Sequence, residues 1–225
     1  MRMDEHADGA AMAKWAEVYE ALRARILSCE LAPGTPVSEL TLAKQYNCSP
    51  TPVRDALNRL RQEGLVVRES SRRQVVQGLD FVEIRNLCEA RAALECACAR
   101  IYLESDAATL DAGLDGLELL AHQALESGDD RAALVHLNRD FHVALAALTH
   151  NDHLIRMVAQ ILEASERIFR IGLITLTARD IKDEHLRITA ACRARDHERV
   201  LALLTQEATN TLRRVSENLL KQLSF

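Results

Sequence analysis

Apolar residues recur every three or four positions along most of the chain after residue 80. One stripe contains Ile84, Leu87, Leu94, Cys98 and Ile101, and the next contains Leu110, Leu114, Leu117 and Leu120. This spacing matches the turn of an α-helix and places each stripe on one helix face. The four prolines of the chain all precede residue 53, and β-branched runs are scarce in the later part. The pattern predicts an all-α bundle.

Capping residues and breaks divide this bundle into about six helices. Asp80 and Asp106 are placed to cap the first two helices. The segment 127–129, Ser-Gly-Asp, separates the second helix from a third of about twenty residues, which ends near residues 150–151. The other three helices are expected at about 152–176, 179–195 and 196–223.

Shorter periodic segments occupy the first part of the chain. Pro33-Gly34 predicts a turn, and Ser38 can cap a short helix that carries Leu42, Ala43 and Tyr46. A second helix can start at Ser49, with an apolar stripe of Val53, Ala56, Leu57 and Leu60. The prolines at positions 50 and 52 fit its first turn, where backbone N–H groups have no intrahelical partner.

A hairpin should follow this second helix. Gly64 ends the helix, residues 65–67 are β-prone, and after a polar tip at 69–73 the chain returns through Val75-Val76. With a further helix from about residue 15, the order is helix, helix, turn, helix and two-stranded wing. We therefore predict a mostly α protein, an N-terminal winged helix-turn-helix followed by the helical bundle.

Charge is unevenly distributed between these two parts. The 225 residues have a formal net charge of −5 and a pI of about 5.9, which excludes a basic coat protein for nucleic acid. Residues 40–79 nevertheless hold seven Lys and Arg against three Asp and Glu, whereas residues 80–225 hold 17 against 23. We predict a flexible terminus at 1–14, a DNA-binding domain at 15–78 and a second, helical domain at 79–225.

Residues 15–78 resemble the winged helix-turn-helix of GntR-type transcriptional regulators. The run at 49–57, Ser-Pro-Thr-Pro-Val-Arg-Asp-Ala-Leu, is similar to the family signature Ser-Arg-Thr-Pro-Val-Arg-Glu-Ala-Leu, and the likeness continues to the Glu-Gly-Leu-Val ending at 63–66. Pro50, Leu40 and Arg73 depart from the usual arginine, basic residue and wing-tip glycine. The resemblance implies binding to double-stranded operator DNA with an altered operator preference. The candidate contacts are Ser49, Thr51, Arg54, Arg59, Arg72 and Arg73.

Polar side chains interrupt the apolar stripes of the expected bundle. Arg91 lies on the first helix, Asn138 and His142 lie one turn apart on the third, His185 lies on the fifth and Glu207 lies on the sixth. An unpaired polar group costs several kcal/mol, roughly, in an apolar interior. These residues should therefore meet one another, a metal ion or a polar ligand.

Residues 80–222 resemble the FCD effector domain that follows many GntR-type heads, which implies that the domain at 79–225 binds an effector and forms the dimer. His142, after Phe141, and His185, after Glu184, take the places of two metal-binding histidines, whereas Asn138 stands at the usual aspartate and Glu207 at the usual third histidine. The resemblance implies a divalent site for zinc, nickel, iron or manganese at Asn138, His142, His185 and Glu207. The alternative is a core in which Glu207 pairs with a protonated histidine.

Arg91 has two interpretations as well. Its guanidinium can offer a bidentate fork to a carboxylic-acid effector, or it can form an ordinary i, i+4 pair with Glu95. We predict a transcriptional repressor that binds a near-palindromic operator as a homodimer and responds to a small organic acid. The alternatives are a regulator that senses the metal ion itself and, less favoured by these residues, a metal-dependent enzyme.

The cysteines and the start of the chain bear on location. The six cysteines form no Cys-x-x-Cys pair and lie mostly in apolar stripes, so we expect reduced core residues. No apolar run reaches the ~18 residues of a membrane span, and the first residues lack a secretion-signal pattern. We expect a cytoplasmic protein that does not bind membranes.

Overall fold

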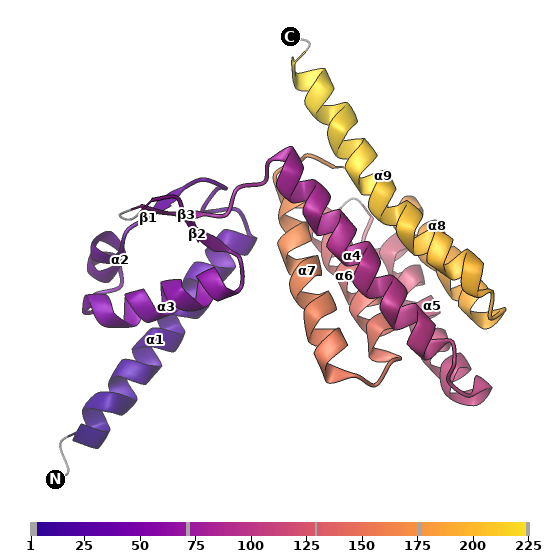
Figure 1. Ribbon diagram of the computed structural model, residues 1–225, viewed down its shortest axis with the longest axis horizontal. Coiled ribbons are helices and arrows are strands. Elements are labelled where there is room, and N and C mark those ends of the chain that lie inside the picture. The colour runs from indigo at the N-terminus through magenta and orange to yellow at the C-terminus, as the bar shows by residue number, and fades with distance from the viewer. Residues whose placement is uncertain (1–3, 71–72, 129, 175–176, 224–225) are drawn as a thin grey trace. The chain divides into compact units, whose positions relative to one another are not determined.

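The computed structural model describes residues 4–70, 73–128, 130–174 and 177–223, and its chain forms two compact units, Met1–Leu79 and Asp80–Phe225. The first unit contains three helices and three strands within its described part (Figure 1). They are α1 (Asp4–Leu27), β1 (Pro36–Val37), α2 (Glu39–Gln45), α3 (Pro50–Gln62), β2 (Val66–Arg68) and β3 (Gln74–Val76). Helix α1 includes most of the segment for which the sequence predicts a flexible terminus.

The core of the first unit lies between α1 and α3. Val18, Leu22 and Ile26 of α1 are completely buried. They meet the predicted stripe of α3, whose four members Val53, Ala56, Leu57 and Leu60 are all buried. The remaining faces of α3 are free of this packing, so its polar residues point outward.

The two predicted helix caps differ. The Ser38 hydroxyl accepts a hydrogen bond from Thr41 N, so this cap of α2 is confirmed. Ser49 occupies the N-cap position of α3, but its side chain makes no cap hydrogen bond within the described structure. A cap hydroxyl normally accepts from the second or third helical N–H, and the third position here is Pro52, which has none. The Ser49 hydroxyl is therefore available to another partner.

The predicted hairpin is present as β2 and β3, and a third strand that the sequence did not predict, β1, extends the wing to a three-stranded sheet. Its order is β1-β3-β2 with both pairs antiparallel, and Pro36 and Val37 pair with Val75 and Gln74. A two-residue strand that begins with proline has too few positions to show the alternation of a strand. The pairing ties the segment before α2 to the base of the wing.

Six helices form the described part of the second unit, as the apolar stripes predict. They are α4 (Phe81–Tyr102), α5 (Ala107–Glu126), α6 (Arg131–Ala147), α7 (Asp152–Arg170), α8 (Ala178–Arg193) and α9 (His197–Leu223). Asp80 and Asp106 accept cap hydrogen bonds from Glu83 N and Thr109 N, as expected. Helix α7 ends six residues earlier than predicted, because Gly172 adopts a left-handed φ of 80° just beyond it.

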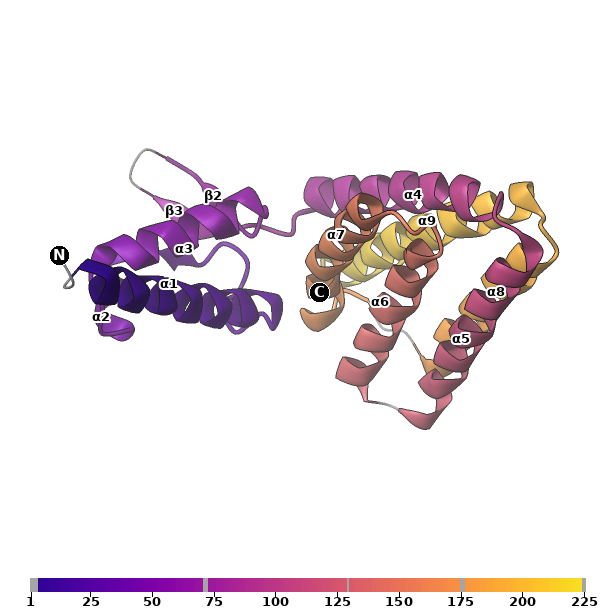
Figure 2. The same ribbon diagram turned by 90° about the horizontal axis from the view of Figure 1, so that it is seen from below.

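Helix pairs surround the main apolar core of this unit. Figure 2 shows α5 beside α8 and α4 beside α9, and α4 and α6 both contact α7. Tyr102, Leu114 and Phe141 are completely buried in this core. The inward faces of α4, α6, α8 and α9 carry the polar residues described below. Within the described residues, no helix is both long and apolar enough to cross a membrane.

Candidate functional site

The N-terminal end of α3 presents an exposed polar face. Ser49, Thr51 and Arg54 are all exposed there. Arg54 Nε lies 3.0 Å from Glu39 Oε2 of α2, so one carboxylate from the neighbouring helix holds the guanidinium of the outward arginine. Glu39 was not singled out from the sequence, because a pairing between two helices leaves no periodic signal.

The other two described arginines of the predicted surface also have carboxylate partners. Arg59 lies towards the C-terminal end of α3, where its Nε donates to Glu63 Oε1 at 2.8 Å. Tyr19 of α1 donates to the same oxygen at 2.7 Å. Arg73 Nε lies 3.0 Å from Glu69 Oε2 in the wing, and both side chains are exposed. Arg72 lies outside the described residues.

A groove of about 350 Å³ joins the start of α2 to the wing. Its lining comes from Pro36, Val37, Ser38, Glu39, Leu40, Arg68, Arg73 and Gln74. Leu40 is strongly exposed at this groove, at the position where the predicted surface lacks a basic residue. Glu39 both lines the groove and pairs with Arg54, so it connects the wing side of this surface with α3.

The polar residues predicted in the bundle seams converge in the second unit. Arg91 comes from α4, Asn138 and His142 from α6, His185 from α8 and Glu207 from α9, and all five are buried. We call these five residues together with Glu95 the buried cluster. The sequence identified five of its members from helical periodicity, and it considered Glu95 only as a partner of Arg91.

Charged groups alternate in this buried cluster. Glu207 Oε1 accepts a hydrogen bond of 2.7 Å from Arg91 Nη2 and lies 3.0 Å from His142 Nε2. Arg91 Nε donates to Glu95 Oε1 at 2.9 Å, and His142 Nδ1 lies 3.1 Å from that oxygen. The i, i+4 pair considered from the sequence is therefore present. Arg91 additionally holds a carboxylate that is 116 residues away along the chain.

The electrostatics follow from this alternation. Burial opposes protonation of His142, but Glu207 and Glu95 outweigh it and raise its pKa to about 9. Burial disfavours the charge on Glu207 too, but Arg91 and His142 hold its pKa well below the ordinary value. Burial, and then the charge of His142, lower the pKa of His185 well below 6.5. Near neutral pH, His142 is therefore protonated and His185 is neutral.

His185 is oriented by its neighbours. Its ring stacks on Phe141, with ring centroids 3.7 Å apart and planes 5° apart. Its Nε2 lies 3.2 Å from Asn138 Oδ1. These contacts fix the plane of the imidazole and point one ring nitrogen towards the amide oxygen.

The donor set fits a divalent metal ion. His142, His185 and Glu207 each offer one ligand atom, and these atoms lie within 4.8 Å of one another. Two imidazoles, a carboxylate and the Asn138 amide oxygen suit zinc and other first-row divalent ions. Glu207 Oε2 is buried without a hydrogen-bond partner within the described residues, so this carboxylate has an oxygen to spare. Arg91 Nη2, however, lies 2.8 Å from His142 Nε2 and is also bonded to Glu207.

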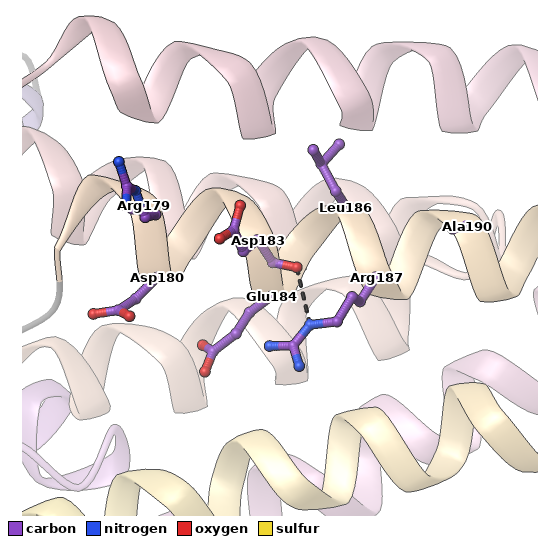
Figure 3. A pocket seen from close by; sticks show the side chains of 7 residues that line it. All are labelled: Arg179, Asp180, Asp183, Glu184, Leu186, Arg187 and Ala190. Carbon is purple, nitrogen blue, oxygen red and sulfur yellow. Dashed lines mark hydrogen bonds between the residues drawn. The ribbon is translucent and has the colours of Figure 1, made fainter.

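The buried cluster reaches the surface at Glu207. A small opening between α8 and α9 is lined by Glu184, Arg187, Ile188, Leu203, Gln206, Glu207 and Asn210. An adjoining hollow of about 650 Å³ lies over α8, and Glu184 and Arg187 line both (Figure 3). There Arg187 Nε donates to the Asp183 carbonyl at 3.1 Å, which draws its guanidinium along the helix.

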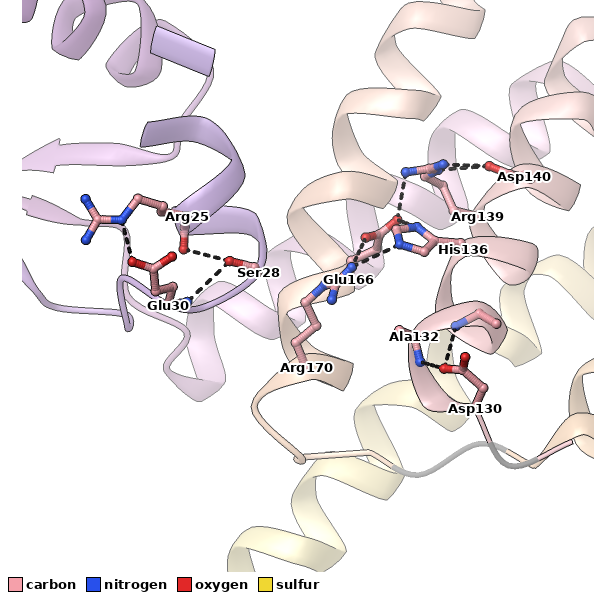
Figure 4. Close-up of polar contacts among 11 residues, drawn as sticks. Arg25, Ser28, Glu30, Asp130, Ala132, His136, Arg139, Asp140, Glu166 and Arg170 are labelled. Atoms are coloured by element: carbon pink, nitrogen blue, oxygen red, sulfur yellow. Dashed lines mark hydrogen bonds and ion pairs between the residues drawn. The ribbon is translucent and has the colours of Figure 1, made fainter. Parts of the chain in front are cut away.

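A second polar cluster, around Glu166 of α7, was not predicted. Figure 4 shows Glu166 between Arg139, His136 and Arg170. Arg139 Nη1 lies 3.2 Å from Glu166 Oε1, and Arg170 Nη2 lies 3.6 Å from Oε2. Burial raises the pKa of Glu166 despite these cations. Its partners are half-exposed residues of α6 and α7, which the apolar stripes do not mark.

Both parts of the chain match known families. Residues 14–76 match the model described as bacterial regulatory proteins, gntR family, and residues 86–208 match the FCD domain. The chain is 32% identical over 180 residues to the Nta operon transcriptional regulator of Aminobacter aminovorans, covering 79% of this chain and 83% of that protein. It is 38% identical over 84 residues to the HTH-type transcriptional repressor RspR of Escherichia coli strain K12, but spans only 37% of RspR.

Solved structures give the same picture. A GntR family member from Pseudomonas syringae pv. tomato is 27% identical with a TM-score of 0.52, and the match covers 95% of this chain and 89% of that one. McbR/YncC of E. coli has a TM-score of 0.67 at 21% identity, covering 91% and 97% of the two chains, and shows the shared fold alone.

Proposed function

Because this chain belongs to the gntR family of bacterial regulatory proteins and carries an FCD domain, we propose that it is a repressor whose operator affinity is set by a small organic acid. The role as a transcriptional regulator follows from membership of the gntR family. The observation that supports an organic acid as the effector is the buried cluster, in which Arg91 already holds two carboxylates inside an apolar bundle. A guanidinium in this setting is a site for a carboxylate ligand.

The DNA contacts of the proposal lie on the head, residues 15–78. Ser49, Thr51 and Arg54 meet phosphates and base edges in the major groove, and Arg73 with Arg72 follows the backbone or minor groove. Arg59 is the weakest candidate, a phosphate contact that first has to leave Glu63. Two heads in a homodimer would read the two halves of a near-palindromic operator, with the domain at 79–225 forming the dimer. Such a protein works in the cytoplasm, where bacterial DNA is.

The effector part of the proposal is an exchange at Arg91. An acid that enters at Glu207 competes with this residue for the Arg91 guanidinium, because both ligands are carboxylates. Glu207 belongs to α9, so its release changes how α9 is held against α4. Operator affinity changes if the two arrangements hold the heads of the dimer at different spacing.

A divalent ion at Asn138, His142, His185 and Glu207 is the cofactor of this proposal. When bound, it supplies positive charge that attracts a carboxylate. The convergence of three ligand atoms within 4.8 Å also supports a second candidate function, a regulator in which the ion itself is the effector.

One set of titrations tests these functions. The preferred operator is first selected from a random duplex library, and its affinity is then measured with carboxylic acids, with a chelator and with added Zn²⁺. We expect one acid to lower the operator affinity of the native chain and to have no effect on Arg91→Ala. An operator affinity that changes with metal and chelator but with no acid would favour the metal sensor. A chain that selects no duplex would refute both proposed functions.

A further inference from the structure

We propose that the Arg91 guanidinium is the resident cation of the buried cluster, and that a divalent metal ion binds tightly only when a carboxylate ligand has drawn Arg91 away from Glu207 and His142. The acid and the metal would then bind cooperatively. This inference rests on the proposed function, because it takes both ligands to share one domain, and it adds the rule that links them.

The distances place Arg91 in competition with a metal ion. Arg91 Nη2 lies 2.7 Å from Glu207 Oε1 and 2.8 Å from His142 Nε2, and both residues belong to the set whose ligand atoms converge. An ion bonded to both atoms at about 2.0–2.2 Å would approach them from the side on which this nitrogen lies. The ion and Nη2 cannot occupy that position together.

Arg91 can release these two atoms and stay anchored. Its Nε donates to Glu95 Oε1 at 2.9 Å, and Glu95 lies one turn along the same helix. The Nη2 end can therefore turn away while the Nε contact remains. A buried guanidinium that gives up Glu207 needs another anion, because an unpaired charge is costly in an apolar interior. A ligand carboxylate is such an anion.

Charge balance leads to the same coupling. Imidazoles that bind a metal are neutral, so the charges that count are those of Arg91, Glu95, Glu207 and the ion. Arg91 and a divalent ion together carry three positive charges against two negative ones, which leaves one positive charge uncompensated. A single ligand carboxylate neutralises it. Without the ion, the same carboxylate would add a third negative group to the buried cluster, so each ligand lowers the cost of binding the other.

The position of Glu207 gives the order of events. Glu207 is the member of the buried cluster that lines the opening between α8 and α9, whereas Arg91 lies behind it. An incoming carboxylate therefore meets the Glu207–Arg91 pair before it meets any other part of the buried cluster. Glu207 Oε2 has no hydrogen-bond partner within the described residues, so both oxygens of this carboxylate can serve the ion once Arg91 has released Oε1.

The test measures Zn²⁺ affinity directly. The chelator-treated full chain is titrated with Zn²⁺ against a chromophoric chelator, in sodium acetate or in sodium chloride of equal ionic strength. We expect acetate to tighten Zn²⁺ binding by about tenfold or more. In Arg91→Met we expect Zn²⁺ to bind about tenfold more tightly than in the native chain without any acid, and the acetate effect to disappear.

Matched variants make the result specific. Arg85→Met removes an arginine from the same helix that pairs with Glu89 at the surface, and it should leave Zn²⁺ binding unchanged. If circular dichroism shows that Arg91→Met does not fold, Arg91→Lys replaces it. An ammonium group cannot hold both glutamates in the same fork, so Arg91→Lys should weaken the competition with the ion. Its Zn²⁺ affinity in chloride should lie between the affinities of the native chain in chloride and in acetate.

Three results would overturn the inference: equal Zn²⁺ affinity in acetate and chloride, unchanged Zn²⁺ affinity in the Arg91 variants, or no Zn²⁺ binding under any condition. The proposed function fails separately. Release of the operator by an acid, together with a Zn²⁺ affinity that is equal in acetate and chloride, would keep the proposed function while the inference falls. Coupled Zn²⁺ and acetate binding with an operator affinity that never changes would do the reverse.

Discussion

Arg54 of the head and Arg91 of the bundle each pair with a glutamate from another helix, at similar distances and in opposite surroundings. Arg54 lies 3.0 Å from Glu39, with 58% and 27% of the two side chains exposed. Arg91 lies 2.7 Å from Glu207, with 5% and 9% exposed. An exposed pair contributes about 0–1 kcal/mol, whereas breaking a buried pair costs about 3–5 kcal/mol. Arg54 can thus exchange Glu39 for a DNA phosphate at a small cost in free energy. Arg91 can give up Glu207 only if another anion takes its place.

The largest expected effect comes from breaking the buried pair. Glu207→Ala should lower the free energy of unfolding by about 3 kcal/mol or more, because it leaves Arg91 with one carboxylate in an apolar interior. Urea denaturation measures this loss. Glu217→Ala is the matched control on the same helix, since Glu217 pairs with Arg213 at 2.6 Å on the surface, and it should cost less than about 1 kcal/mol.

A double variant sharpens this first prediction. Arg91→Met with Glu207→Leu replaces the pair by apolar groups and should recover part of the loss of Glu207→Ala. A double variant that is as unstable as the sum of its single changes would mean that the two residues act independently.

Next in size is the pH dependence of the bundle. The pKa of His142 is raised from 6.5 to about 9 in the folded chain, so its stabilisation is complete below pH 6.5 and is lost as the pH rises through 9. The loss is roughly 3 kcal/mol at most. His185 acts in the other direction, because its lowered pKa costs stability as the pH falls below 6.5.

Urea denaturation of the metal-free chain at pH 6.5 and pH 9 measures this change. His142→Gln should remove the alkaline loss, and His122→Gln, which alters an exposed histidine of α5, should retain it. An alkaline loss that persists in His142→Gln would assign the effect to another group.

The third effect concerns the exposed face of the head. Arg54→Ala should weaken operator binding by about 1–3 kcal/mol, because its only described carboxylate partner is one that DNA can replace. Arg59→Ala should weaken it less, since Arg59 is engaged with Glu63 beside Tyr19. Fluorescence anisotropy at fixed salt, with operator and scrambled duplexes, separates the two variants. Equal losses would remove the distinction between the two ends of α3.

The smallest effect should come from Glu39→Gln. The change removes a negative charge near the DNA and also releases Arg54 from its fixed position. We expect affinity for scrambled duplex to rise and the ratio of operator to scrambled affinity to fall by roughly threefold, below about 1 kcal/mol. Glu30→Gln, which alters the pair with Arg25, is the control and should leave this ratio unchanged. A ratio that also stays constant in Glu39→Gln would mean that Glu39 does not position Arg54.

The sequence predicted the helices well because the burial of one helix face repeats along the chain. The stripe of α3 and the six helices of the bundle follow from that repeat, and the caps at Ser38, Asp80 and Asp106 follow from side chains that act on their own helix. The same periodicity placed Asn138, His142 and His185 on inward faces. Local rules suffice for these features.

Partners across helices were harder to predict. Periodicity shows that Arg91 and Glu207 both point inward, but it does not show that one holds the other, and for the same reason Glu39 was missed as the partner of Arg54. Ser49 occupies its expected position, yet Pro52 removes the N–H that its hydroxyl would cap. In each case the deciding contact depends on a second segment or on a missing donor.

Glu207 sits on a helix that is far longer than the cluster it serves. At 1.5 Å per residue, the 16 positions from Glu207 to Leu223 extend about 24 Å, so a tilt of about 5° at Glu207 displaces the end of α9 by about 2 Å. A small movement of the Glu207 carboxylate that tilts α9 therefore becomes a larger displacement at the C-terminal end of the helix. Because α9 is long, the exchange of one carboxylate partner at Arg91 can displace residues that are far from the buried cluster.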